Sequence, residues 1–490
     1  MKKVITILFL ISSFYSFAQN SYIVQGEGSF GLNMPYDILI KPDNNVLYLV
    51  NTADAAAQSS VTDIHELSPQ GEILQRITLA DTSISSETAL NLFQVEDTVY
   101  VISTGQRVAE KENTIIVMRK LDLQLNTIDT YHIGLELGNC DYLIPMGKFV
   151  YHNGLIEGFL SNAKTNGIIR PFFVRLTKYG EVIKLMEDSA TMYNHRPFDF
   201  LYRPDNLGYY VFELVIEASG SFLYCYDQEL NVESICELPY DGPVYVSALH
   251  EDDDSFYFAQ TFYDSYPYQC FRMAMFEMTA GGEIIHEFIH NDIYPSGVAY
   301  HRSIDHCPDG SLVLCGTNNL QNLILPQDQP SQILLFKLDD NLEPIWQRYI
   351  GSDMGKYDAY AVRCAPNGDI VILANFTRIP TVPPNINQPV FIRTNPDGVI
   401  TSISDKDITL SSSEALVYPN PAHHQLTIDY SPAYTDAEFA LRTIDGKIVL
   451  QCHLTENKKI LDITALSPGT YIYKLYNSQG LNESGKLVVE

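Results

Sequence analysis

The chain has little of several features that whole classes of protein depend on. Its 8 cysteines include no C-x-x-C pair and are too few for a disulfide scaffold. Lysine and arginine number 31 against 60 aspartate and glutamate, and the formal charge of -29 disfavours nucleic acid or an anionic membrane surface as a partner. Beyond the N-terminal region, no segment approaches about 18 uninterrupted apolar residues, so the mature chain is predicted to be soluble.

One cysteine pair is close enough in sequence to test as a disulfide. Cys225 and Cys236 flank a turn at Asp227 to Asn231 and could face each other across a hairpin. A slip of one residue in strand register would separate them.

The N-terminal residues have the three parts of a cleavable secretory signal. Met1-Lys2-Lys3 is positive, Val4 to Phe17 is apolar, and a small-residue site ends at Ala18. The apolar run is short for a membrane span, so cleavage near Ala18 is predicted for residues 1–18. The alternative is an uncleaved anchor in the inner membrane.

Between Leu32 and Ser404 the sequence repeats itself, and two turn signals mark each unit. The first series consists of Pro42-Asp43-Asn44, Glu96-Asp97, Met146-Gly147-Lys148, Pro204-Asp205-Asn206, Asp252-Asp253-Asp254, Pro308-Asp309-Gly310 and Pro366-Asn367-Gly368. The second consists of Pro69-Gln70-Gly71, Gln124-Leu125-Asn126, Lys178-Tyr179-Gly180, Gln228 to Asn231, Ala280-Gly281-Gly282, Asp340-Asn341 and Pro396-Asp397-Gly398. Either series gives seven units of roughly 50 to 58 residues, a period typical of radially repeated sheets.

Each unit contains four strand-like runs, and no stretch has sustained helical periodicity. Unit six is an example, with runs at Tyr300 to Asp305, Ser311 to Gly316, Gln332 to Leu338 and Pro344 to Ile350. Four-stranded sheets stacked around an axis bury each other's faces, which predicts an all-β, seven-bladed β-propeller over residues 21–404. Tyr22 to Gln25 is expected to close the ring in the last blade. Two stacked β-sandwiches are the alternative.

After a linker at residues 405–414, residues 415–490 alternate apolar and polar positions, which predicts a small immunoglobulin-like β-sandwich. The motifs of this segment, in order, are Tyr418-Pro419-Asn420-Pro421, Asp445-Gly446-Lys447, Asp462-Ile463, Pro468-Gly469-Thr470-Tyr471 and Lys486-Leu487-Val488. Together they resemble the C-terminal sorting domain of the type IX secretion system. The resemblance implies recognition by the outer-membrane translocon after transport through the periplasm, and release or display at the cell exterior. Its sorting residues would be Pro419, Asn420, Pro421, Gly446, Lys447, Gly469, Tyr471 and Lys486.

The propeller units also resemble, more loosely, the repeats of bacterial secreted β-propellers. Phe336-Lys337-Leu338-Asp339 followed by Trp346 is the nearest match. Neither the Gly-His and Trp-Asp signature nor a kelch double glycine is present.

Two motifs suggest chemistry that their surroundings do not support. His286-Glu287-Phe288-Ile289-His290 matches the zinc-protease pattern, which needs a helix, yet it follows a turn where the other units have an outer strand. In a strand the two histidines would lie roughly 13 Å apart, too far to share an ion. Gly26 to Gly31 matches G-x-G-x-x-G, but Pro35 follows and no βαβ unit surrounds it, which predicts a loop.

No cofactor or metal site is predicted. Asp252, Asp253 and Asp254 could hold calcium, but their position matches a solvated turn in the other units. The pattern G-x-S-x-G is absent, and no catalytic residue is assigned. Insertions rich in tyrosine and proline are the predicted recognition surface, with Tyr263, Tyr266 and Tyr268 as rim contacts for a glycan or peptide.

The leading hypothesis is therefore an exported, non-catalytic propeller that binds a ligand or serves as a scaffold at the cell surface or after release. Two alternatives remain open: a secreted hydrolase or lyase acting on polysaccharide or peptide, and a structural adhesion component. The fold alone cannot choose among them.

Overall fold

The computed structural model describes residues 21–25, 33–54, 59–108, 114–134, 142–163, 169–187, 194–203, 207–215, 220–240, 245–250, 255–264, 270–292, 294–319, 330–352, 355–378, 387–400, 415–418, 422–430, 437–443, 447–455, 458–476 and 482–489. Regular structure in these ranges is all β-strand, and they hold no helix long and apolar enough to cross a membrane. The chain divides into two compact units, Met1–Ser404 and Asp405–Glu490.

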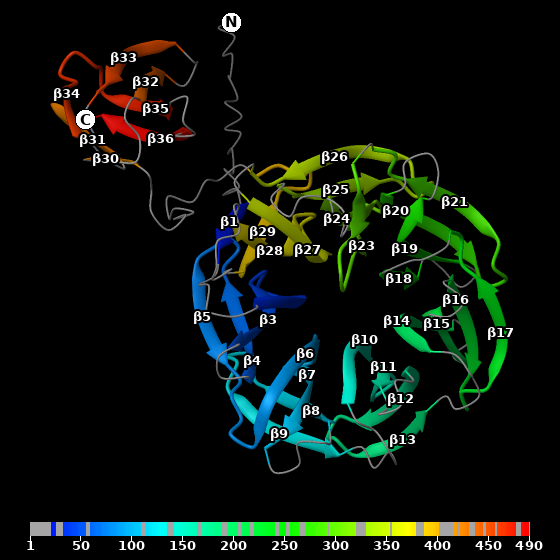
Figure 1. Cartoon of the computed structure of the whole chain (residues 1–490). Coiled ribbons are helices and arrows are strands. Elements are labelled where there is room, and N and C mark those ends of the chain that lie inside the picture. Colours follow the sequence, from blue (N-terminus) through cyan, green and yellow to red (C-terminus); the bar gives the residue numbers. More distant parts are fainter. Residues whose placement is uncertain are drawn as a thin grey trace, which may run out of the picture. The chain divides into compact units, whose positions relative to one another are not determined.

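Seven sheets, numbered here in chain order, form the described part of the first unit (Figure 1). Sheet 1 contains β2 (Asn33–Ile40), β3 (Val46–Asp54), β4 (Ser59–Leu67) and β5 (Ile73–Thr78). Sheet 2 contains β6 (Ile84–Val95), β7 (Thr98–Arg107), β8 (Thr114–Leu121) and β9 (Thr127–Gly134). Sheet 3 contains β10 (Tyr142–His152), β11 (Leu155–Ala163), β12 (Ile169–Thr177) and β13 (Val182–Glu187).

The remaining four sheets follow the same plan. Sheet 4 contains β14 (His195–Tyr202), β15 (Gly208–Val215), β16 (Gly220–Asp227) and β17 (Val232–Glu237), and sheet 5 contains β18 (Val246–His250), β19 (Ser255–Asp264), β20 (Cys270–Thr279) and β21 (Ile284–Ile289). Sheet 6 contains β22 (Ser296–Val298), β23 (Ile304–His306), β24 (Leu312–Asn318), β25 (Gln332–Leu338) and β26 (Pro344–Ile350). Sheet 7 contains β27 (Gly355–Cys364), β28 (Ile370–Arg378), β29 (Asn387–Thr394) and β1 (Tyr22–Gln25).

The sheets stand around one axis, with the first strand of each sheet nearest the centre (Figure 1). Neighbouring strands are antiparallel and, except for β1, adjacent strands in a sheet are close in sequence. β1 pairs with β29, placing Tyr22 opposite Arg393, so the start of the described chain supplies the outer strand of the last sheet. The predicted closing strand is therefore confirmed, and the first unit has a propeller arrangement.

Apolar residues fill the space between consecutive sheets rather than within one sheet. The core between sheets 1 and 2 joins Leu49 and Ile64 to Leu92 and Val101, all of which are at most 2% exposed. Equivalent clusters join sheets 2 and 3, 3 and 4, 4 and 5, and 5 and 6. Face-to-face burial explains why the strands contain consecutive apolar residues, because both faces of each sheet are covered.

The junction of sheets 7 and 1 depends on β1 and β29. The Tyr22 hydroxyl lies 3.0 Å from the hydroxyl of Tyr48 in sheet 1. Arg393, which is fully buried, pairs with Asp369 at 2.9 Å and donates a hydrogen bond of 3.0 Å to the carbonyl oxygen of Asn44. Polar contacts as well as apolar packing therefore hold the two ends of the ring together.

The turn that follows β4, β8, β12, β16, β20, β25 and β29 is the same in all seven sheets. A residue with positive φ closes each turn, and its N–H donates to the carbonyl oxygen three residues earlier. These residues are Gly71, Leu125, Gly180, Leu230, Gly282, Leu342 and Gly398. Glycine adopts this conformation without steric cost, whereas the three leucines are at most 7% exposed, so burial of their side chains offsets the strain.

Two sequence assignments in the repeat are wrong. Met146-Gly147-Lys148 is not a turn: it lies inside β10, and the turn to β11 is formed by Asn153 and Gly154, which both have positive φ. Gly147 has the positive φ of a turn glycine, but it lies at a β-bulge between Ile144 and Gly147. In unit six, the run from Tyr300 to Asp305 is not one strand, because β22 and β23 pair separately with β24.

The candidate bridge between Cys225 and Cys236 does not form. In the hairpin of β16 and β17, Cys225 lies opposite Ser234 and Cys236 lies opposite Leu223, and both thiols are free. A bulge between Cys225 and Tyr226 sets this register. The disulfide joins Cys307, after β23, to Cys364 at the end of β27, with 5.2 Å between their Cα atoms. It therefore crosslinks sheet 6 to sheet 7.

The second unit has two sheets. One contains β30 (Ala415–Tyr418), β31 (Gln425–Tyr430) and β34 (Lys458–Asp462), and the other contains β33 (Ile448–Leu454), β32 (Ala437–Thr443), β35 (Gly469–Tyr476) and β36 (Asn482–Val489). Leu426 and Ile428 of the first sheet share one core with Phe439, Leu441 and Leu475 of the second. Their alternation with exposed residues follows from one buried and one wet face per sheet.

Stability of the first unit should fall between pH 6.5 and 4 because of His65. This residue of β4 is 4% exposed and lies 5.1 Å, ring to ring, from Phe391 of sheet 7. Burial, aided by Arg76, lowers its pKa from 6.5 to about 4. The unfolded chain therefore binds a proton in this range that the folded chain does not, so stability is complete above pH 6.5 and is lost as pH falls toward 4.

The expected loss from His65 is roughly 2 to 3 kcal/mol between pH 7.5 and 4.5. Urea unfolding at both values, on the full chain and on a His65→Phe variant, measures it. The variant should lose that much less stability on acidification. An identical pH dependence in the two proteins would contradict the assignment.

Candidate functional site

The centre of the first unit is shaped by β-bulges that recur on the inner strands. A bulge lies between Pro35 and Asp37, Ala89 and Asn91, Ile144 and Gly147, Pro197 and Asp199, and Ala359 and Ala361, in sheets 1, 2, 3, 4 and 7 respectively. The extra residue of a bulge is unpaired, so its side chain is turned out of the normal alternation. In sheets 1, 4 and 7 that residue is aromatic: Tyr36, Phe198 and Tyr360.

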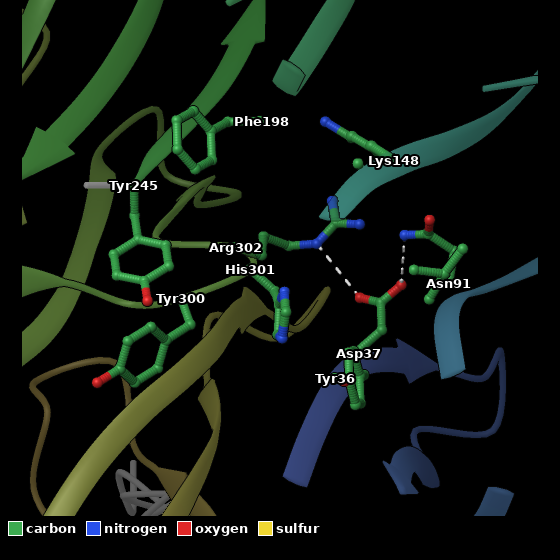
Figure 2. A pocket seen from close by; sticks show the side chains of 11 residues that line it. Tyr36, Asp37, Asn91, Lys148, Phe198, Tyr245, Tyr300, His301 and Arg302 are labelled. Atoms are coloured by element: carbon green, nitrogen blue, oxygen red, sulfur yellow. Dashed lines mark hydrogen bonds and ion pairs between the residues drawn. The ribbon is translucent and has the colours of Figure 1, made fainter. Parts of the chain in front are cut away.

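Six rings contributed by five sheets form a continuous series, which we call the aromatic arc. Its members, with centroid distances between successive rings, are Phe198, Tyr245 (6.2 Å), Tyr300 (4.7 Å), Tyr360 (4.7 Å), His301 (5.7 Å) and Tyr36 (4.6 Å). Tyr36 and Tyr360 are buried, whereas Phe198, Tyr245 and Tyr300 are half-buried and His301 is exposed. Figure 2 shows Phe198, Tyr245, Tyr300 and His301 along one side of the pocket.

Two adjoining cavities, together called the central channel, lie inside the inner strands. The smaller, of about 60 Å³, is lined by five members of the aromatic arc. The larger, of about 380 Å³, receives residues from all seven inner strands. Four residues line both cavities: Asp37, Asn91, Lys148 and Arg302. The channel therefore has an aromatic end, lined by the aromatic arc, and a polar section where these four shared residues lie. We call this polar section the waist.

At the waist, four consecutive sheets place a polar residue directly after the bulge. These residues are Asp37, Asn91, Lys148 and Asp199. Each contacts the next sheet: Asp37 accepts from Leu92 N at 3.1 Å, Asn91 from Phe149 N at 2.7 Å, and Asp199 from Ala248 N at 2.9 Å, while Lys148 pairs with Asp199 at 2.6 Å. Side chains thus occupy inner-edge N–H groups that the sheet ladder leaves unpaired.

Three more side chains accept a hydrogen bond from a backbone N–H group of the next sheet. Together with the contacts above, they form what we call the polar belt. Thr261 accepts from Val298 N at 2.9 Å, Thr317 from Ala359 N at 2.9 Å, and Asp305 from Cys364 N at 2.9 Å. In each case the acceptor belongs to one sheet and the donor to the next.

Three cations converge on the waist, and we call them the cation triad: Lys148, Arg302 and Arg363. Arg302 Nε lies 3.4 Å from Asp37 Oδ1, and Arg363 Nη1 lies 3.3 Å from Asp305 Oδ1. Burial lowers the pKa of Lys148, although Asp199 opposes the shift. Burial would raise the pKa of Asp37, but Arg302 and Arg363 together lower it. The three aspartates that pair with the triad also accept backbone hydrogen bonds.

Two groups at the aromatic end have shifted pKa values. Burial lowers the pKa of His301 to about 4 despite the nearby Asp37. Its ring is open to water in the channel, but the confined position still favours the neutral form. Burial raises the pKa of Asp358 to about 6, with Lys356 offsetting part of the effect. No hydrogen-bond donor to the Asp358 carboxylate occurs among the described residues, and its charge influences Tyr245 and Tyr300.

The predicted rim residues are only partly within the described chain. Tyr263, near the end of β19, is 41% exposed, and its ring makes an edge contact with Phe271 at 5.5 Å. It lies two residues beyond Thr261, whose N–H donates to the carbonyl oxygen of Tyr245, so it is at the aromatic end of sheet 5. Tyr266 and Tyr268 lie outside the described residues.

Some of the predicted sorting residues lie within the described chain and others lie outside it. Pro419, Asn420, Pro421 and Gly446 lie outside the described residues, and Lys486 is in β36 opposite Ile472. Lys447 is exposed, and its carbonyl oxygen accepts from Thr443 N. Tyr471 is 6% exposed and donates its hydroxyl to Ser467 O at 2.7 Å, which fixes the turn containing Gly469.

The zinc-protease pattern lies in a strand, as predicted. His286 is in β21 and pairs with Glu277 at 2.7 Å, whereas His290 is 7% exposed and contacts Ser296 at 3.1 Å. Their partners differ, so the two imidazoles do not form one site. Within the described ranges, no group of three His, Cys, Asp or Glu side chains could hold a metal ion. Gly26 to Gly31 and Asp252 to Asp254 lie outside those ranges.

Sequence reasoning missed the channel residues. Their signal is a short apolar-polar-apolar pattern at one place in successive units: Tyr36-Asp37-Ile38, Leu90-Asn91-Leu92, Gly147-Lys148-Phe149 and Phe198-Asp199-Phe200. Aligning the units on this pattern would have placed one polar residue per sheet at the same level. That they face a common cavity follows only from closure of the ring.

Residues 416–490 match the family model of the secretion system C-terminal sorting domain. The predicted type IX sorting tail is thereby confirmed, and the chain carries the address for export to the cell surface or medium. Comparison with curated proteins gave no match.

Several solved structures resemble the chain at low identity. The β-propeller domain of the trilobed protease from Pyrococcus furiosus is 11% identical over 78% of this chain and 98% of that chain, with a TM-score of 0.42. An α-L-arabinanase from Penicillium chrysogenum, complexed with arabinobiose, is 11% identical over 77% of this chain and 98% of that chain, with a TM-score of 0.42. At these values the likeness carries no information on activity.

Proposed function

We propose that this exported protein is a seven-bladed β-propeller that binds a glycan non-catalytically in its central channel. In this proposal each numbered sheet is one blade of a propeller at residues 21–404, preceded by a signal peptide at 1–18. Residues 405–414 are a linker, and residues 415–490 fold as an immunoglobulin-like sandwich that the type IX translocon recognises through the sorting residues named above.

The aromatic arc is the observation that carries the proposal. Five sheets supply its rings, and bulges turn several of them toward one space, so the arrangement needs the whole ring of sheets. Accessible faces of Phe198, Tyr245 and Tyr300 offer flat apolar surfaces beside a polar waist. Such a pairing suits sugars, whose rings have apolar faces and hydroxyl edges. The larger cavity, about 380 Å³, is in the range of small-ligand sites.

A peptide fits the channel less well. Extended peptides commonly bind by adding a strand to a free sheet edge, which requires unpaired backbone donors. Here the inner-edge N–H groups of Leu92, Phe149 and Ala248 are taken by side chains of the preceding sheets. Recognition must therefore use side chains, which favours a sugar.

Binding rather than catalysis is favoured by the state of the waist acids. Asp37, Asp199 and Asp305 each pair with a cation and accept a backbone hydrogen bond, so their oxygens are already occupied. A carboxylate held in this way is poorly placed to exchange a proton with a substrate. A structural role for these three carboxylates therefore accounts for their contacts.

A Tyr300→Ala variant tests the binding proposal. It should weaken binding of whichever oligosaccharide a glycan array identifies by about tenfold, because removal of a central stacking surface costs roughly 1.4 kcal/mol. Calorimetric titration of the full chain gives the measurement. Tyr179→Ala, which truncates a tyrosine that is 54% exposed in an outer turn, is the matched control and should bind normally. Silence of the wild-type protein on the array would refute the proposal.

Hydrolysis is the second candidate, and Asp358 is the observation that favours it. A carboxyl with a pKa of about 6 beside Tyr300 is suited to act as a general acid. Turnover of a polysaccharide panel by the full chain, abolished in Asp358→Asn, would establish catalysis. The rate should then fall as pH rises above about 6, where the acid is lost.

A further inference from the structure

In the central channel, several N–H groups of the arginines have no acceptor in the described part of the chain, whereas the nearby aspartate oxygens already accept hydrogen bonds. Arg302 touches a carboxylate through Nε alone, at 3.4 Å, and that nitrogen makes no hydrogen bond. Arg363 makes a single hydrogen bond, from Nη1 to Asp305 at 3.3 Å. Among the described residues, no acceptor is bonded to the remaining guanidinium nitrogens of these two arginines. Both line the larger cavity, and both guanidinium groups are partly exposed there.

The acids nearby do not complete these contacts. Asp37 accepts from the backbone N–H groups of Ile38 and Leu92, and Asp199 accepts from those of Phe200 and Ala248. The oxygens of each carboxylate therefore accept hydrogen bonds from two backbone amides and also contact one cation. Three cations therefore face three aspartates whose oxygens the amides already occupy in part, and the waist retains unsatisfied N–H donors.

Lys148 belongs to the same arrangement. Figure 2 shows its side chain and that of Arg302 reaching into the same space from sheets 3 and 6. Lys148, Arg302 and Arg363 repel one another, and this repulsion helps to lower the pKa of Lys148. Like charges brought together at a cavity in a chain of net charge -29 require a reason beyond fold stability.

We propose that the cation triad binds a carboxylate of the ligand, so that the glycan taken by the channel is an acidic one built from uronic acid residues. This inference rests on the proposed glycan binding and names its chemical class. The fork of an arginine matches a carboxylate through two parallel hydrogen bonds, and Lys148 adds a third charged donor. The aromatic arc then stacks on the neighbouring sugar rings.

The acidic surface of the protein does not prevent this. Charges separated by more than about 8 Å are largely screened at physiological ionic strength. Contacts inside the channel are screened less, because the charged groups that make them are partly buried. The local donors therefore decide which ligand is retained.

The test compares two ligands with the same sugar backbone: trigalacturonic acid, whose carboxyl groups are ionised, and its fully methyl-esterified form, which is uncharged. Calorimetric titration of the full chain should show that the acid binds at least tenfold more tightly than the ester, as expected for charge-assisted hydrogen bonds. Lys148→Met should remove most of that preference for the acid over the ester. Lys148→Arg should retain it.

Two further variants keep the result interpretable. Lys148→Met/Asp199→Asn removes both members of the ion pair, so no charge is left unpaired if the single variant fails to fold. Lys184→Met, which truncates a lysine of outer strand β13 paired with the exposed Glu229, should behave as wild type.

The outcomes separate the two proposals. Equal affinity for acid and ester, or a preference that survives in the double variant, would overturn the acidic-ligand inference while glycan binding stands. Binding of neutral oligosaccharides alone would do the same. Binding of peptides but no sugar would overturn both.

Discussion

Replacing Tyr22 by alanine is expected to destabilise the first unit by about 3 to 5 kcal/mol, the usual cost of truncating a buried aromatic residue. Tyr22 is fully buried although it stands in a strand of only four residues. Its ring lies against Gly71, where an added Cβ would come within 2.6 Å of Cγ, and its hydroxyl meets that of Tyr48. The side chain thus fastens sheet 7 to sheet 1.

Urea unfolding followed by circular dichroism measures this effect. Tyr22→Phe keeps the ring and should cost only about 1 kcal/mol, for the lost hydrogen bond to Tyr48. Tyr294→Ala, which truncates a tyrosine that is 51% exposed, should change little. If Tyr22→Ala unfolds at the same urea concentration as wild type, β1 does not secure the ring.

Loss of the Cys307–Cys364 disulfide is expected to cost about 4 kcal/mol. The two cysteines are separated by 57 residues, so the bond removes the entropy of a long loop from the unfolded chain. It joins sheets 6 and 7 beside the waist, where Asp305 also bonds Cys364 N and pairs with Arg363. Its removal should therefore weaken the same ring that Tyr22 closes, at a different junction.

A Cys307→Ser/Cys364→Ser variant, compared with wild type in urea without reductant, gives the value. Wild type with reductant should approach the variant, and Cys452→Ser, which changes a free thiol of the second unit, is the control. Equal stability of the oxidised wild type and the double variant would contradict the prediction.

The repeat was readable from the sequence because its turns are local. Residues such as Gly71 and Gly180, or an Asp or Thr three residues before the positive-φ position, specify a turn within four residues of chain. Strands β25 and β26 could be bounded correctly for the same reason, since turn residues flank uninterrupted apolar runs. The error at Gly147 shows the limit, because a bulge glycine and a turn glycine look alike without partners.

The disulfide carried a signal that was overlooked. Cys307 stands immediately before the turn Pro308-Asp309-Gly310, and Cys364 stands two residues before the turn Pro366-Asn367-Gly368 of the next unit. The two cysteines are therefore one position apart in the frame of consecutive units, and such positions lie close together once the ring forms. Proximity in sequence suggested Cys225 and Cys236 instead, but the register of β16 and β17 leaves them two positions out of alignment.

The sorting domain was the part of the chain that its sequence predicted best. Several short motifs occur in order over about 75 residues, and the family model matches residues 416–490 of the same segment. The sequence did not predict the channel. Its residues Asp37, Asn91, Lys148 and Arg302 are far apart in sequence, and each looks like an ordinary strand residue.

An all-β chain of repeated units with a C-terminal sorting domain could be predicted from the residues alone, because turns, strand periodicity and linear motifs are encoded within a few residues of one another. The residues that meet at the axis, the cysteines that bond and the way sheet 7 joins sheet 1 became known only from the folded chain. The contact between Arg393 and Asn44, for example, joins residues 349 positions apart, and it depends on the summed twist and register of every sheet between them.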